Sequence, residues 1–176
     1  LLLDVPAAFD AVLFVENLVT FERMADHRQP AWQHCLLVYA AGFKGSARRL
    51  RSPTGCRLYV RGGATPLQAV QAWLFGGASV PVRFFGDLDP AGLRILASLR
   101  EVFPGAQAWQ PGYEVLACRL EQGDGHTPEQ AAKGLQGEPV MTGCAYADTR
   151  LLPLMQRLGR CIDQEAYAVV EAAAAR

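Results

Sequence analysis

The feature that most constrains the fold is a junction at residues 83–92, where an apolar run meets two aspartates and a helix start. Residues 80–85 are rich in valine and phenylalanine, which predicts a buried strand. Asp89 stands where a helix N-cap is expected, and Pro90 takes the first helical position, which proline favours. The chain therefore passes from strand to helix here, with Asp87 and Asp89 at the turn.

Asp87 and Asp89 are alternate residues, and alternate side chains of an extended segment point the same way. Two carboxylates held close together repel each other unless a proton or a cation lies between them. Mg²⁺ takes oxygen ligands and often uses only one or two carboxylates, so the pair predicts a metal site. The alternative is a plain turn in which Asp89 caps the helix. Both roles are compatible, since one carboxylate oxygen can bind metal while the other caps.

Two earlier apolar runs have the pattern of strands buried on both faces of a parallel sheet. Residues 11–15 end at Glu16, and residues 35–40 end at the glycine-containing residues 42–46. Strands alternate with helices along the chain, which predicts an α/β, Rossmann-like fold with a mainly parallel sheet of about four strands flanked by helices. We expect residues 1–176 to form a single domain.

Ligands of open α/β sheets bind beyond the carboxyl ends of the strands. The predicted strand ends carry Glu16, the turn at residues 42–46, and Asp87 with Asp89. A shared site requires the strand that ends at Glu16 to lie near the strand that ends at Asp87. If the two strands were at opposite edges of the sheet, the hypothesis would fail.

Composition indicates a soluble globular protein, with 51% hydrophobic and 19% charged residues. No apolar run reaches the roughly 18 residues that a membrane span needs. The five cysteines include no Cys-x-x-Cys pair, so we expect reduced thiols in the cytoplasm and no zinc site. Lysine plus arginine and aspartate plus glutamate number 17 each, whereas a lone nucleic-acid-binding domain is usually basic. DNA affinity would then come from a local basic face or from another domain. Because the chain opens on Leu1 rather than methionine, we expect it to be a fragment of a longer protein or to lack its start.

A strand ending in Glu16, a glycine turn at residues 42–45 and a strand ending in Asp87-x-Asp89 together resemble the Toprim domain of topoisomerases, primases and nucleases. Further segments resemble the C-terminal domain of the nuclease subunit of Wadjet anti-plasmid systems, a relative of type IIB topoisomerase A subunits. These segments are residues 15–17 with Thr20 and Phe21, residues 85–89 with Gly92, residues 113–116 with Leu120, residues 127–130 and residues 163–165.

The resemblance implies that Glu16, Asp87 and Asp89 hold one or two Mg²⁺ or Mn²⁺ ions. It also implies cleavage of double-stranded DNA with water as the nucleophile, and a partner complex containing an SMC-like ATPase. A homodimer is plausible because two strands must be cut and two-fold dimers are common.

Further basic residues are candidates for contacts with DNA. Lys44 lies between two glycines at a strand end, where it would contact a phosphate or be an exposed loop residue. Arg48 and Arg49 belong to a basic segment that would bind the DNA backbone or form a solvated helix face.

The last part of the chain is predicted to be helical from Asp148 or Thr149 onward, with a break near Gly159. Asp163 and Glu165 lie beyond that break. They would either complete a second metal position or remain surface residues.

Two other functions stay open. A topoisomerase-like subunit would cleave DNA by transesterification with a tyrosine from another domain, because no tyrosine of this chain lies in a suitable segment. A non-catalytic Toprim module would only scaffold a DNA complex. The three histidines, including His126, are isolated in the sequence and are interpreted as surface or packing residues.

Overall fold

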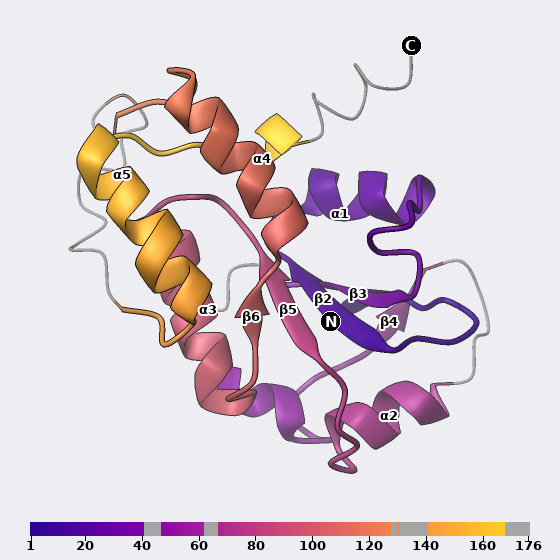
Figure 1. The fold of residues 1–176 in the computed structure, drawn as a ribbon. Helices are drawn as coiled ribbons and strands as arrows, with labels where there is room; N and C mark the ends of the chain where they lie inside the picture. Colours follow the sequence, from indigo (N-terminus) through magenta and orange to yellow (C-terminus); the bar gives the residue numbers. More distant parts are fainter. Residues whose placement is uncertain (41–46, 62–66, 128–129, 131–140, 168–176) are drawn as a thin grey trace.

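The computed structural model describes residues 1–40, 47–61, 67–127, 130 and 141–167 of the chain. Its centre is a six-stranded sheet with the strand order β4-β1-β3-β2-β5-β6 (Figure 1). The strands are β1 (Leu2–Asp4), β2 (Ala11–Val15), β3 (Cys35–Tyr39), β4 (Tyr59–Val60), β5 (Val82–Phe85) and β6 (Gln107–Ala108).

The expected α/β fold with a mainly parallel sheet is confirmed, but the sheet has more strands than the predicted four. Strands β3, β2, β5 and β6 form a parallel core. Strand β1 runs antiparallel to β3, and β4 pairs in parallel with β1. These two additional strands have only three and two residues, and such short segments carry little of the pattern by which strands are recognised.

Helices cover both faces of the sheet. Phe85 packs against Trp109 and Tyr113 at the start of α4 (Gln110–Glu121), with ring centroids 5.3 and 5.4 Å apart. Tyr39 occupies the same face, because both it and Phe85 are in register with Val15, and it contacts α1 (Leu18–Asp26) through Phe21. Helices α1 and α4 therefore lie on one face.

The opposite face packs on different helices. Phe14 precedes Val15 and points to the other side of the sheet. It contacts Trp73 in α2 (Gln68–Leu74) and Phe103, which follows α3 (Pro90–Val102). Two-sided coverage explains why the central strands are apolar throughout, with every residue of β2 buried. Among the helices that the structure describes, none has the length and apolar character that a bilayer crossing requires.

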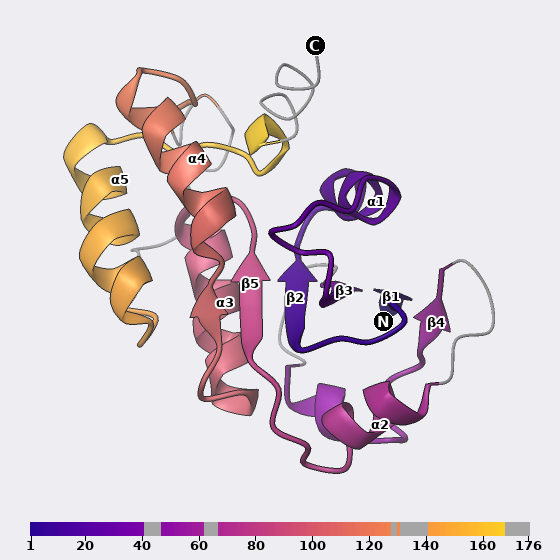
Figure 2. The ribbon, with the colours of Figure 1, turned by 45° about the vertical axis from the view of Figure 1, so that its right-hand side comes forward.

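The chain reverses its direction of travel across the sheet between β2 and β5. From β2 it passes through α1 to β3 on one side, whereas from β5 it passes through α3 to β6 on the other. In Figure 2 the arrows of β2 and β5 point the same way, toward α1 and the yellow segment near residue 165. Open α/β sheets bind their ligands at such a reversal, beyond the carboxyl ends of the strands.

The C-terminal part returns to this end of the sheet. A π-helical turn (Ala147–Leu151) leads into α5 (Leu152–Leu158). The helix ends at Gly159, whose φ of 61° is left-handed, so the predicted break is confirmed. Residues 161–167, hereafter the strap, then cross the sheet end. Leu88 and Ile162 exchange two backbone hydrogen bonds, as do His126 and Cys161.

Candidate functional site

The strands that end at Glu16 and Asp87 are neighbours. Strands β2 and β5 are parallel, and Val15 is in register with Phe85. The next residues therefore emerge side by side, and Oε2 of Glu16 accepts a hydrogen bond of 3.1 Å from the backbone N–H of Asp87. The geometric condition derived from the sequence, that these two strands lie close together, is met. The metal-binding role of the two carboxylates remains a prediction.

Two glycines make the close approach possible. A Cβ atom at Gly86 would lie 2.3 Å from Oε2 of Glu16 and 2.6 Å from the Phe84 ring. A Cβ atom at Gly92 would lie 2.2 Å from the carbonyl oxygen of Asp87, which lets the first turn of α3 pack against the strand end. Glycine at both positions therefore shapes the turn that carries Asp87.

Asp89 has a different environment from Asp87. Its side chain is 2% exposed, and its Oδ1 accepts a 2.7 Å hydrogen bond from the N–H of Gly92, so it is the N-cap of α3. The capping role considered from the sequence is confirmed. A second role of the same carboxylate at a metal ion remains a prediction.

The strap brings Gln164 and Glu165 to the same place. Gln164 is fully buried and accepts a 2.9 Å hydrogen bond from the backbone N–H of Asn17. Its backbone N–H donates to Oδ1 of Asp87 at 2.8 Å. The side-chain amide of Asn17 donates in turn to Glu165 at 2.7 Å. Glu165 therefore reaches the site, whereas Asn17 and Gln164 were not assigned a role from the sequence. Their only signal was their position beside the acidic candidates.

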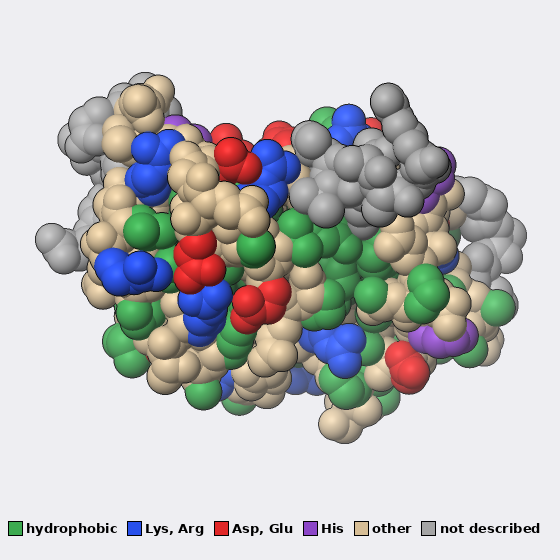
Figure 3. All heavy atoms as spheres, turned by 45° about the horizontal axis from the view of Figure 1, so that its top comes forward, with side chains coloured by type: hydrophobic (Ala, Val, Ile, Leu, Met, Phe, Trp, Pro, Cys, Tyr) green, Lys and Arg blue, Asp and Glu red, His purple; other side chains and the backbone are tan. Residues whose placement is uncertain are grey.

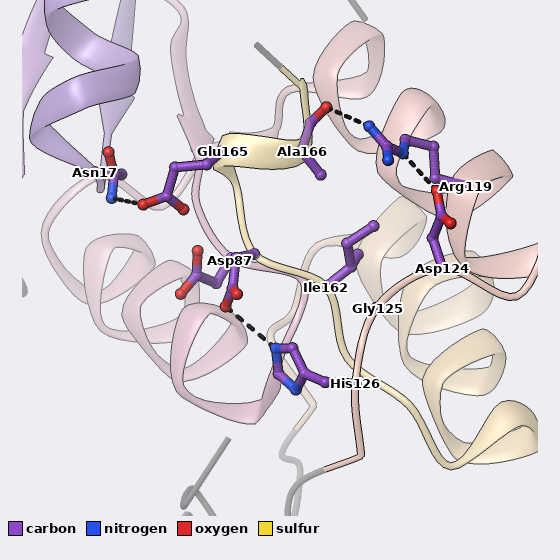
Figure 4. Close-up of a pocket in the computed structure, with 10 residues that line it drawn as sticks. Asn17, Asp87, Arg119, Asp124, Gly125, His126, Ile162, Glu165 and Ala166 are labelled. Carbon is purple, nitrogen blue, oxygen red and sulfur yellow. Dashed lines mark hydrogen bonds and ion pairs between the residues drawn. The ribbon is translucent and has the colours of Figure 1, made fainter. Parts of the chain in front are cut away.

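A pocket of about 730 Å³ lies between these residues and α4. Figure 4 shows Asn17, Asp87 and Glu165 at one end and Arg119 with Asp124 at the other. Arg119 forms a 2.8 Å ion pair with Asp124 and also donates to the carbonyl of Ala166. The lining residues are Asn17, Asp87, Arg119, Asp124, Gly125, His126, Ile162, Asp163, Glu165 and Ala166.

His126 has a partner that its isolation in the sequence did not suggest. Its Nε2 lies 3.3 Å from Oδ1 of Asp163, and its Nδ1 lies 3.2 Å from the carbonyl oxygen of Thr127. Asp163 is about half exposed and lines the pocket beside Asp87. His126 and Arg119 therefore give a largely acidic pocket two basic side chains.

Tyr113 is hydrogen-bonded to the turn that carries Asp87. Its hydroxyl oxygen accepts a 3.1 Å hydrogen bond from the N–H of Gly86, and the side chain is fully buried. Burial raises the pKa of this tyrosine well above its usual value, and the charges of Glu16, Asp87 and Asp89 raise it further, against the effect of the Gly86 bond. All three predicted carboxylates therefore act electrostatically on one buried hydroxyl group.

Of the predicted basic residues, Arg49 is described by the structure, and it does not line this pocket. Lys44 and the side chain of Arg48 lie outside the described residues. Arg49 is exposed in a 3₁₀ helix (Ala47–Arg51) whose Arg51 stacks on Phe103, just beyond the end of α3. Asp87 precedes the start of α3, so it lies at the other end of this helix from Phe103 and Arg51.

The donor atoms fit a hard divalent cation, but they do not form a closed cage. In the part of the chain that the structure describes, no three His, Cys, Asp or Glu side chains are grouped so as to hold a metal ion. The carboxylates have protein partners instead: Asp89 caps a helix, Glu165 contacts Asn17, and Glu16 contacts the Asp87 backbone. Carboxylate oxygens are nevertheless the ligands that Mg²⁺ and Mn²⁺ prefer, and Mg²⁺ usually keeps several waters.

Comparisons with known proteins identify a family. Neither the curated proteins nor the solved structures contain a match to this chain. The model of one family, described as "Wadjet protein JetD, C-terminal", matches residues 2–136, well over half of the chain. The match contains β2, β5 and the turn with Asp87, whereas the strap lies beyond it. This chain therefore belongs to the family of C-terminal domains of the Wadjet protein JetD.

Proposed function

We propose that this chain is the catalytic, Toprim-type domain of a metal-dependent endonuclease that cleaves double-stranded plasmid DNA in a Wadjet defence system. The single observation that carries the proposal is the meeting of Glu16 and Asp87 at the reversal of the sheet, joined through the 3.1 Å hydrogen bond. Membership of the Wadjet family supports a role in that system.

Glu16, Asp87 and Asp89 would hold Mg²⁺ or Mn²⁺, with Asp163 and Glu165 beside a second position. When bound, the ion supplies positive charge at the scissile phosphate and activates the attacking water. Backbone groups of this domain hold the carboxylates in place. The backbone N–H of Gln164 orients Asp87, and the backbone N–H of Asp87 orients Glu16.

The far wall of the pocket suits a phosphodiester. Arg119 lines the end of the pocket opposite Asp87 and Glu165, whereas His126 lies beside Asp163, and arginine is well matched to phosphate oxygens. The pocket is about 730 Å³ in volume, enough for a sugar–phosphate segment rather than a whole duplex. We expect these two side chains to contact the DNA backbone next to the carboxylates.

Water is the proposed nucleophile, since none of the described tyrosines is among the residues that line the pocket. Tyr113 is the tyrosine hydrogen-bonded to the site, but it is fully buried with a raised pKa. Tyr59 is exposed on β4, which is separated from β5 by β1, β3 and β2. The topoisomerase-like alternative therefore needs a tyrosine from another domain.

DNA affinity is expected to come largely from partners. The face drawn in Figure 3 has basic and acidic side chains interspersed rather than one basic patch, in keeping with a net charge of zero. We propose that an SMC-like ATPase complex presents plasmid DNA in the cytoplasm, and that two copies of the domain cut the two strands.

Plasmid cleavage by the full-length protein with its partners tests the function. Asp87→Asn keeps the size of the side chain but removes its charge. We expect cleavage to fall by about a thousandfold, because metal stabilisation of the transition state is worth several kcal/mol. Glu16→Gln should have a similar effect, and both variants should keep the wild-type melting temperature within a few degrees.

Metal titration separates the nuclease from a non-catalytic scaffold. The wild-type protein should bind Mn²⁺, detected as loss of the electron paramagnetic resonance signal of the free ion, and Asp87→Asn should bind it much more weakly. Unchanged Mn²⁺ binding by Asp87→Asn and Glu16→Gln, together with unchanged cleavage, would eliminate the proposed site.

A further inference from the structure

Gln164 is a fully buried polar side chain at the centre of the strap. Its Oε1 accepts from the N–H of Asn17 at 2.9 Å, and its Nε2 donates to the carbonyl oxygen of Phe85 at 3.1 Å. The two backbone groups belong to the carboxyl ends of β2 and β5, two residues beyond β2 and at the last residue of β5. One amide group therefore bridges the two strand ends that carry Glu16 and Asp87.

The backbone of the same residue contacts the site directly. Its N–H donates a 2.8 Å hydrogen bond to Oδ1 of Asp87. Such a bond restricts the rotation of the carboxylate group, and so it limits where the second oxygen can lie. The side chain of Gln164 sets where the strap sits, and its backbone sets how Asp87 is oriented.

Docking of the strap does not itself require an amide at this position. Tyr167 packs on Phe85 and Trp109 with ring centroids 5.2 and 5.7 Å away, and Ile162 pairs with the backbone of Leu88. An apolar side chain of similar size would avoid burying an amide group, although it would leave the Asn17 N–H without this acceptor. The amide instead provides one donor and one acceptor that match two particular backbone groups, so it fixes the register of the strap.

We infer that Gln164 is a positioning residue for the metal site, which sets the separation of Glu16 and Asp87 and the orientation of the Asp87 carboxylate. This role rests on the proposed metal-dependent function. It adds to that function a residue of the strap, which lies beyond residues 2–136, the part that the family model matches. Side chains that orient metal ligands change metal affinity by 10–100-fold when they are replaced.

The test is Mn²⁺ binding by the intact protein, measured without DNA as the loss of the free-ion signal. Gln164→Met keeps a long unbranched side chain but removes both hydrogen-bonding groups. We expect the dissociation constant for Mn²⁺ to rise about tenfold. In cleavage assays with the partner subunits, the Mg²⁺ concentration for half-maximal activity should rise by a similar factor, and high Mg²⁺ should restore most of the rate.

A matched control separates positioning from general loss of stability. Leu99→Ala truncates a fully buried leucine of α3 that does not line the pocket. It should lower the melting temperature by at least as much as Gln164→Met while the Mn²⁺ dissociation constant stays at the wild-type value. Equal metal affinity of Gln164→Met and wild type, or equal weakening by both variants, would overturn the role of Gln164 alone. A wild-type protein that binds no Mn²⁺ would overturn the proposed function and this role with it.

Discussion

Two regions bring carboxylates to the pocket, and they are built differently. The turn at residues 86–92 contains contacts between residues that are close in the sequence. Oδ1 of Asp89 accepts a hydrogen bond from the N–H of Gly92, and Gly92 leaves room for the carbonyl of Asp87. The strap at residues 161–167 is organised by distant partners. Gln164 bonds to Asp87 across 77 positions and to Asn17 across 147.

This difference indicates that the turn is the more rigid part of the site. In the turn, backbone and side chains are so close that a single added carbon atom would collide with a functional group. In the strap, position depends on a few hydrogen bonds and on aromatic contacts of Tyr167. We therefore expect substitutions in the turn to change activity through steric displacement, whereas substitutions in the strap change the strength of metal binding.

The largest effect after loss of Asp87 itself is expected from Gly86→Ala. Its Cβ atom would lie 2.3 Å from Oε2 of Glu16, so the carboxylate must move. A displacement of about 1 Å at a catalytic group costs about a hundredfold in rate, and we expect plasmid cleavage to fall by that factor. Overpacking against the Phe84 ring should lower the free energy of unfolding by about 1–3 kcal/mol, measured by urea denaturation.

Gly105→Ala is the control for Gly86→Ala. Nothing lies within 4 Å of a Cβ atom built at Gly105, and this glycine is not among those with a positive φ. It should leave both cleavage and stability close to wild type. Full activity of Gly86→Ala would show that the turn is softer than its contacts indicate, and the contrast with the strap would disappear.

A tenfold effect is expected from Asp89→Asn. Asparagine caps helices as well as aspartate does, so the free energy of unfolding should stay within about 0.5 kcal/mol of wild type. Loss of the negative charge should still weaken Mn²⁺ binding and slow cleavage by about tenfold, if the carboxylate acts on the metal as well as on the helix.

Asp89→Ala supplies the comparison for this substitution. It removes the cap as well as the charge, and should cost about 1 kcal/mol of stability in addition. Wild-type cleavage by Asp89→Asn with a loss of stability only in Asp89→Ala would restrict Asp89 to capping. The turn would then contribute a single carboxylate, Asp87, to the pocket.

Local features were predictable from the sequence, and distant pairings were not. The strand before Asp87, the cap at Asp89 and the break at Gly159 each depend on residues within one helical turn of one another. The location of Glu16 and Asp87 at the same end of the sheet followed from the alternation of strands and helices together with the rule for strand ends, whereas the adjacency of their two strands did not.

The position of the strap could not be predicted in this way. Its position depends on the amide of Gln164 meeting two backbone groups and on the ring of Tyr167 meeting Phe85. No periodicity encodes these contacts. For the same reason the sequence left His126 without a partner, since Asp163 lies 37 positions away.

The smallest effect on cleavage is expected from Tyr113→Phe, which tests whether the turn at residues 86–92 also depends on a residue distant in the sequence. Tyr113 belongs to α4, 27 positions from Gly86, and its hydroxyl group accepts the Gly86 N–H. Tyr113→Phe leaves this buried N–H without that acceptor, and the free energy of unfolding near neutral pH should fall by about 1–3 kcal/mol. Cleavage should fall little, because Tyr113 does not line the pocket.

The free energy of unfolding should differ between wild type and Tyr113→Phe by an amount that depends on pH, and this dependence tests whether the hydroxyl group causes the difference. The pKa of Tyr113 is raised in the folded protein, mainly by burial and then by the charge of Glu16. Its stabilising contribution is therefore complete below about pH 10, the value in the unfolded chain, and is lost as the pH rises further toward the folded value. Urea unfolding at about pH 8 and about pH 10.5 should show the gap between wild type and Tyr113→Phe narrowing at the higher pH. Tyr146, whose pKa is also raised, is present in both proteins and cancels in the comparison. A gap that stays constant would show that the pKa of Tyr113 is not raised by folding, and would contradict a buried hydroxyl group that accepts the Gly86 N–H.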